Sequence, residues 1–224
     1  MAENNVLSSQ VDTLGVVSTN KVLKNTYLLL AMTLTSSALC AAIATWVGIG
    51  PMASLGLMIA GFVLLFVVHK LADSSKGLPA IFAFTACWGA ALGPTLSFYL
   101  AMPHGPNIVM QALGGTALVF FSLSAYALSS RKDFSYLGGF LLTGLIVVIV
   151  AMLANLFLQI PLLSLTMSGA VVLLMSGFIL FDTSRILHGG ETNYIRATVA
   201  LYLNIYNLFI HLLHLIAVFT GNDD

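Results

Sequence analysis

Long apolar runs separated by short polar connections dominate the sequence. Backbone groups in lipid have to be hydrogen-bonded within their own segment, so such runs predict transmembrane helices. A span needs about 20 apolar residues, and each of the longest uncharged stretches has room for one or two. The stretches without Asp, Glu, Lys or Arg lie between Lys24 and Lys70, between Lys76 and Arg131, and between Asp133 and Asp182.

The runs divide into seven predicted spans, which we expect to form one transmembrane domain over residues 26–221. The predicted fold class is therefore an all-α membrane protein. Residues 1–25 are mainly polar, and we predict that they form a disordered cytoplasmic tail. The predicted spans are Tyr27–Val47, Met52–Val68, Leu78–Leu100, Ile108–Leu128, Tyr136–Phe157, Leu163–Phe181 and Ile195–Phe219.

The third predicted span contains residues that shape its helix. Gly93 and Pro94 should kink it, because proline cannot donate the hydrogen bond that continues a helix. Gly89 and Gly93 form a small-xxx-small pair, which favours close packing against a neighbouring helix.

Composition agrees with a chain that is solvated mostly by lipid. Of its 224 residues, 59% are hydrophobic and 7% are charged, whereas soluble domains are about 45–50% apolar and about 25% charged. This excludes a large soluble domain. The net charge is zero, and there is no basic stripe of the kind that binds nucleic acid.

The basic residues predict the orientation of the chain. The predicted connections around 49–51, 101–106 and 159–161 contain no Lys or Arg, so all eight basic residues lie on the other side. The positive-inside rule then predicts a cytoplasmic N-terminus and, with seven spans, an exported C-terminus. The eight are Lys21, Lys24, Lys70, Lys76, Arg131, Lys132, Arg185 and Arg196.

Four polar residues of the last span, Asn204, Asn207, His211 and His214, are spaced by three, four and three positions. At about 100° per residue they fall within a stripe of roughly 80°, which we call the polar seam. Facing lipid would be costly for these side chains. The polar seam should therefore face the bundle interior, which makes the C-terminal helix central. It is either a structural hydrogen-bonded contact or a partly hydrated, proton-sensitive path.

Asp182 and Arg185 follow the apolar end of the sixth predicted span. Asp182 at a helix C-terminus would be disfavoured by the helix dipole, and Arg185 at i+3 can offset this by pairing with it. Two interpretations stay open. Asp182 is either a charge that marks where the helix leaves lipid, or a titratable group inside the bundle that controls its packing.

Candidate chemistry beyond these groups is sparse. Two histidines alone make a poor metal site, so we expect no metal and no cofactor. Ser168 with His211 or His214 superficially resembles the dyad of an intramembrane protease, but residue 166 is Thr rather than the glycine that rhomboid-type sites use. A serine protease also needs an oxyanion hole. We therefore expect no enzyme.

Three long segments resemble the Bax inhibitor family of seven-helix membrane proteins. They are STNKVLKNTYLLL at 18–30, ALGGTALVFFSLSAYALSSRKDFSYLGG at 112–139 and HGGETNYIRATVALYLNIYNLF at 188–209. The resemblance implies a central last helix surrounded by the other six. With the orientation predicted from the basic residues, we expect a multi-pass protein of the bacterial inner (plasma) membrane with its C-terminus in the periplasm.

The resemblance implies two possible functions. A bacterial branch is associated with binding the FtsH membrane protease and restraining it, which makes FtsH the expected partner. Other members are pH-sensitive leak pathways for calcium, in which two carboxylates share a proton. The first corresponds to Asp182, but the second position is Asn204 here. A leak channel for calcium or protons, with altered gating, is therefore the alternative.

Overall fold

The computed structural model describes residues 2–221 of the chain, and eight helices make up this part. Taken together, α3 and α4 form one membrane span, so the seven predicted spans are confirmed. The helices are α1 (Ala2–Val47), α2 (Pro51–Leu71), α3 (Gly77–Ala91), α4 (Gly93–Leu100), α5 (Gly105–Ser130), α6 (Leu137–Leu158), α7 (Pro161–Leu187) and α8 (Tyr194–Gly221).

The limits of the spans lie within three residues of their prediction, except at the start of the first span and the end of the sixth. The third is broken at Leu92, just before Gly93 and Pro94, as the predicted kink requires. The sixth does not end at Phe181, because α7 continues to Leu187. The prediction ended it too early because the polar residues from Asp182 onward interrupt the apolar run, whereas the bundle buries several of them within a regular helix.

Helix boundaries follow local chemistry. Pro51 and Pro161 occupy the first turn of α2 and α7, where a missing N–H has no cost. At Gly48 and Gly189 the backbone has φ angles of 72° and 73° after the ends of α1 and α7. Glycine adopts this left-handed conformation without strain, which allows the chain to turn back sharply.

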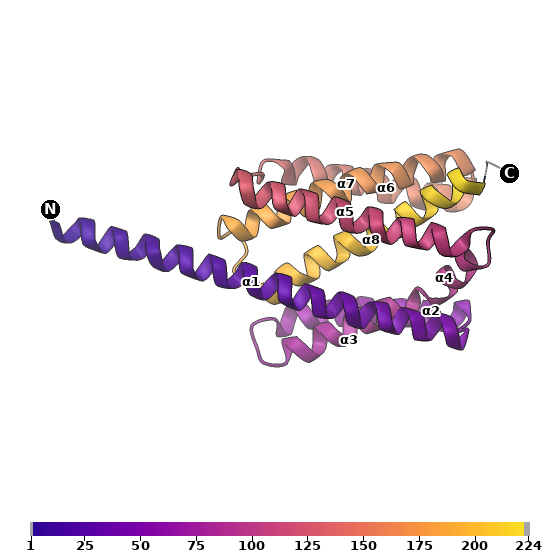
Figure 1. Cartoon of the computed structure of the whole chain (residues 1–224), viewed down its shortest axis with the longest axis horizontal. Helices are drawn as coiled ribbons and strands as arrows, with labels where there is room; N and C mark the ends of the chain where they lie inside the picture. The colour runs from indigo at the N-terminus through magenta and orange to yellow at the C-terminus, as the bar shows by residue number, and fades with distance from the viewer. Residues whose placement is uncertain (1, 222–224) are drawn as a thin grey trace.

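The last helix is central. Figure 1 shows α8 running obliquely between one group formed by α1 to α4 and another formed by α5 to α7. It contacts α1, α2, α3, α5 and α7. This confirms the central position of the C-terminal helix, while α6 packs against α7. The start of α1 projects beyond the bundle (Figure 1); the domain boundary at residue 26 and the disorder of the tail stay predictions.

Side chains are distributed as expected for lipid solvation. Large apolar groups face outward, and Trp46 and Phe157 are 88% and 85% exposed. Small hydroxyl residues such as Thr33 and Thr183 are fully buried, and Thr33 donates to backbone carbonyls of its own helix. An apolar exterior has no cost in lipid, while buried polar groups need such partners.

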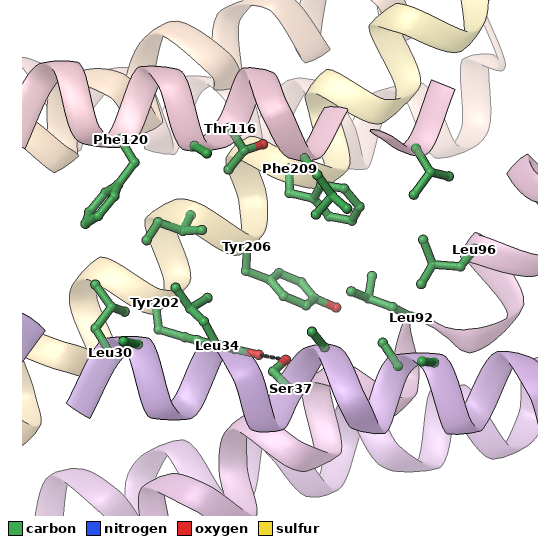
Figure 2. Close-up of a pocket in the computed structure, with 18 of the residues that line it drawn as sticks. Leu30, Leu34, Ser37, Leu92, Leu96, Thr116, Phe120, Tyr202, Tyr206 and Phe209 are labelled. Atoms are coloured by element: carbon green, nitrogen blue, oxygen red, sulfur yellow. Dashed lines mark hydrogen bonds between the residues drawn. The ribbon is translucent and has the colours of Figure 1, made fainter. Parts of the chain in front are cut away.

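Helices α1 and α5 stand on either side of α8 and leave a groove between them (Figure 2). The rings of Tyr27 on α1 and Phe120 on α5 approach each other at one end, with their centroids 5.9 Å apart. Side chains of α8 form the floor of the groove, which we call the α1–α5 groove.

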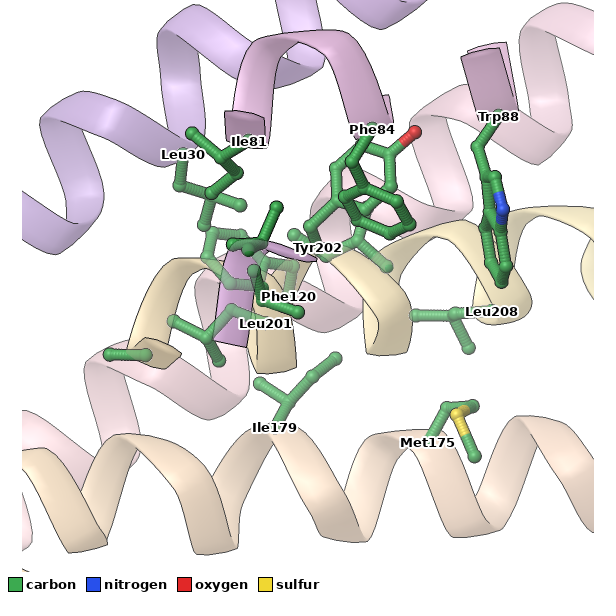
Figure 3. Close-up of a cluster of buried hydrophobic side chains, with 14 of the residues drawn as sticks. Leu30, Ile81, Phe84, Trp88, Phe120, Met175, Ile179, Leu201, Tyr202 and Leu208 are labelled. Carbon is green, nitrogen blue, oxygen red and sulfur yellow. The ribbon is translucent and has the colours of Figure 1, made fainter. Parts of the chain in front are cut away.

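The apolar core lies where α8 meets α3 on one side and α7 on the other (Figure 3). Phe84 of α3 and Tyr202 of α8 pack edge to face, with ring centroids 5.5 Å apart. On the opposite side, Ile179 of α7 lies beside Leu201 of α8, and both are fully buried. Burial on both sides fixes the rotation of α8, and this rotation places its polar seam.

Candidate functional site

The carboxylate of Asp182 and the amide of Asn204 form the contact at the centre of the site. Asn204 Nδ2 on α8 donates a 2.7 Å hydrogen bond to Asp182 Oδ2 on α7. Both residues are buried, with exposed fractions of 7% and 9% respectively. Asp182 lies within α7 and not at its end, so the expected conflict with the helix C-terminus is reduced.

Arg185 lies between two acidic side chains at the same end of α7. Its guanidinium is 4.0 Å from the carboxylate of Asp182 and 4.0 Å from that of Glu191. It also donates a 3.3 Å hydrogen bond to the carbonyl of Gly190 in the α7–α8 turn. The predicted i,i+3 pair is therefore present, but its separation is long. We regard Arg185 as a link between the buried carboxylate and the turn.

His211 reaches α7 rather than a neighbour on its own helix. Its Nδ1 lies 3.2 Å from Ser168 Oγ, and that hydroxyl donates a 3.1 Å hydrogen bond to the backbone carbonyl of Ser164. The direction of the contact between Ser168 and His211 depends on which imidazole nitrogen carries the proton. A nucleophilic dyad needs serine to donate to histidine, and it also needs an oxyanion hole. The arrangement is that of a link between helices.

The other two members of the polar seam have different partners. His214 Nδ1 lies 3.3 Å from Tyr99 Oη on α4. Asn207 donates a 2.8 Å hydrogen bond to the Leu203 carbonyl of its own helix. The four residues therefore do not form one continuous network. Asn204 and His211 join α8 to α7, and His214 joins it to α4.

An open pocket with hydroxyl and amide groups in its wall lies beside His211, at the end of the bundle where α6 ends and α7 begins. Its volume is about 380 Å³, and Ser168 and His211 form part of its wall. Asn155 and Gln159 contribute amide groups from the end of α6. Such a lining can hold water, because it offers several hydrogen-bonding partners.

Sequence reasoning missed the phenols on another face of α8. Tyr202 Oη lies 2.7 Å from Ser37 Oγ on α1, and Tyr206 Oη donates to the Trp88 carbonyl on α3 at 3.3 Å. Their spacing of four positions was a signal that they share a helix face. Tyrosine is amphipathic, however, so its presence in an apolar span did not indicate a polar contact.

A second contact that was missed lies at the start of α8. The Asn193 side chain caps this helix, because its Oδ1 accepts from the N–H groups of Ile195 and Arg196 at 2.9 and 3.1 Å. Its Nδ2 donates to the Ala72 carbonyl and to Asp73 Oδ1 at 2.9 and 2.7 Å. Arg196 also pairs with Asp73. The α2–α3 loop is thereby fastened to the central helix.

Comparisons with known proteins cover the whole bundle. A family model described as "Inhibitor of apoptosis-promoting Bax1" matches residues 19–221. An uncharacterized membrane protein of Vibrio cholerae is 51% identical over 208 residues, which cover 92% of this chain and 93% of the relative. The protein named "Modulator of FtsH protease YccA" of Escherichia coli is 48% identical over 219 residues, which cover 97% of this chain and 99% of the relative.

Proposed function

The chain belongs to the Bax inhibitor family, and we propose that it is a non-enzymatic regulator of the bacterial inner membrane that binds the FtsH protease and restrains its degradation of membrane proteins. The observation that carries this proposal is the similarity to the Escherichia coli modulator of FtsH, which extends over nearly the full length of both chains. The family model matches residues 19–221, which contain all seven spans.

The orientation is part of the proposal. With all eight basic residues on one side, we place the start of α1 in the cytoplasm and the end of α8 in the periplasm. The polar segment before Thr19 is then available to a cytoplasmic ATPase. Reporter fusions check this: a periplasmic reporter such as alkaline phosphatase should be active after residue 221 and inactive before α1.

A regulatory role also agrees with the arrangement of Ser168 and His211. The Ser168 hydroxyl contacts the Ser164 carbonyl of its own helix as well as His211, and a hydroxyl bonded to the carbonyl four residues earlier is common for serines within helices. In this proposal the degradation of membrane proteins is carried out by FtsH, and this chain only restrains it.

The alternative, a leak channel for calcium or protons, has less support. The Asp182–Asn204 contact contains one carboxylate, so it cannot share a proton between two acids. Flux into liposomes between about pH 5 and 8, the range in which a perturbed carboxylate titrates, distinguishes the two functions. We expect the same flux from the wild type, Asp182→Asn and Asn204→Asp. A flux that depends on either substitution would favour the channel.

Co-isolation from native membranes tests the leading proposal. An affinity-tagged chain solubilised in mild detergent should recover FtsH, whereas an unrelated multi-span membrane protein with the same tag should not. Deleting the gene should accelerate the turnover of FtsH membrane substrates, and the full chain should restore the slower rate. Failure to recover FtsH, together with unchanged turnover after deletion, would disprove the proposal.

The turnover assay also distinguishes a contact between FtsH and the N-terminal tail from a contact between FtsH and the transmembrane bundle. A chain that lacks residues 2–18 keeps all seven spans, since the first begins at Thr19. If FtsH engages the tail, this variant should still reach the membrane but should no longer slow substrate turnover. Full activity of the truncated chain would place the contact in the bundle.

A further inference from the structure

The α1–α5 groove is an unfilled space beside α8, with a volume of about 770 Å³. Figure 2 shows Leu34 on α1, Thr116 on α5 and Tyr206 on α8 pointing into it. Apolar side chains make up nearly all of its lining. Protein interiors are close-packed, and an apolar space does not bind water well. Something apolar should therefore occupy the groove.

The polar groups that Ser37, Tyr202 and Tyr206 bring to the lining already have partners. The hydroxyls of Ser37 and Tyr202 lie 2.7 Å apart, and the Tyr206 hydroxyl donates to the Trp88 carbonyl. Because these donors are satisfied within the protein, the floor presents carbon surfaces to an occupant. This favours a hydrocarbon chain over water or a polar ligand.

The size of the groove, about 770 Å³, suits a lipid chain. A water molecule takes up roughly 30 Å³ in the liquid, and a methylene group is of similar size. The groove therefore holds on the order of 25 methylene groups. One or two lipid chains are of this size, and the bilayer supplies them.

A charge at the rim indicates which headgroup fits. Lys24 is exposed and lies seven positions before Ala31, which lines the groove. Seven residues turn an α-helix through almost two full turns, so Lys24 continues the same wall about 10 Å toward the N-terminal end. A lysine there can attract the phosphate of a lipid whose chain enters past Ala31.

We propose that the α1–α5 groove is a binding site for an anionic phospholipid, with an acyl chain against Ala31, Thr116 and Tyr206 and the headgroup at Lys24. The site goes beyond the regulation of FtsH. It is measured on the purified protein alone, so its failure would leave that proposal untouched.

Lipid retention provides the first test. The purified chain is washed in mild detergent, and the phospholipid that remains is identified and counted by mass spectrometry. Ala117 of α5 is exposed and lines the groove, whereas Ala125 of the same helix is exposed outside it. We expect the wild type and Ala125→Trp to retain about one lipid per chain and Ala117→Trp to lose most of it. Ala38→Trp fills the groove from the α1 wall and should reproduce this loss if Ala117→Trp misfolds.

Headgroup preference provides the second test. In nanodiscs of phosphatidylglycerol mixed with phosphatidylcholine, retained lipid should be enriched in phosphatidylglycerol. Lys24→Gln should reduce this enrichment roughly fivefold, the effect expected for one lysine at a membrane surface. The exposed Lys76 in the α2–α3 loop is the matched control, and Lys76→Gln should leave the enrichment unchanged.

Three results would overturn the proposal. Equal retention by Ala117→Trp and Ala125→Trp would show that lipid does not occupy the groove. Unchanged enrichment of phosphatidylglycerol in Lys24→Gln would show that the headgroup does not bind at Lys24. If Ala117→Trp no longer co-isolates FtsH but retains as much lipid as the wild type, a helix of the partner protein occupies the groove instead.

Discussion

The amide of Asn204 donates its hydrogen bond to the carboxylate of Asp182 at 2.7 Å, and this contact joins the central helix α8 to α7. Asn204→Ala would leave a buried carboxylate without this donor. Interhelical hydrogen bonds in membranes average ~0.6 kcal/mol, and we expect about 1–2 kcal/mol here because the acceptor is a carboxylate. Unfolding by SDS from mild detergent, followed by circular dichroism, measures the change.

Asn207 provides the control for this prediction. Its side chain donates within its own helix, so Asn207→Ala should change the free energy of unfolding by less than about 0.5 kcal/mol. The Asp182→Ala/Asn204→Ala double variant should be destabilised by less than the sum of the single changes, since either removes the same bond. Strict additivity would show that the two side chains are not coupled.

Asn193→Ala should be more destabilising than removal of the adjacent ion pair. It deletes the cap of α8 and the bonds to the α2–α3 loop, and we expect a loss of about 1–2 kcal/mol. Arg196→Ala removes a pair that is largely exposed, 38% at the arginine and 71% at Asp73, so at most about 1 kcal/mol should be lost. The same unfolding assay ranks the two variants, and a larger effect of Arg196→Ala would contradict the prediction.

Gly89→Ala should destabilise the bundle by about 1–3 kcal/mol. A β-carbon at this position would overlap the backbone carbonyl of Ser37 on α1, and backbone cannot move aside as a side chain can. Gly114→Ala is the matched control, because a β-carbon there meets nothing within 4 Å. That change should be neutral or stabilising by up to about 1 kcal/mol. Equal midpoints of SDS unfolding for the two variants would show that α1 and α3 can move apart without a loss of stability.

Ser168→Ala tests the non-enzymatic role. We expect a loss of about 0.6 kcal/mol in the free energy of unfolding, because one link between α7 and α8 is removed. In a strain without the wild-type gene, this variant should restrain the turnover of FtsH membrane substrates as the wild type does. Loss of the restraint at a normal level of protein would indicate that the serine acts chemically.

The seven spans followed from the sequence because the cost of unpaired backbone in lipid permits only helices of a limited length. The kink before Gly93 and Pro94 could be read in the same way, because its cause is local. The central position of α8 was predicted from the polar seam, which consists of Asn204, Asn207, His211 and His214. An amphipathic stripe indicates which face of a helix is enclosed, whatever its neighbours are.

The tertiary structure determines the hydrogen-bond partners of the polar seam. Nothing in the sequence indicates that His211 meets Ser168 while His214 meets Tyr99, because partners far apart in sequence depend on the rotation and tilt of whole helices. The end of α7 beyond Asp182 was misplaced for the same reason, since only burial among other helices makes those polar residues tolerable. Hydropathy determines which segments cross the membrane, and packing determines which of their side chains meet.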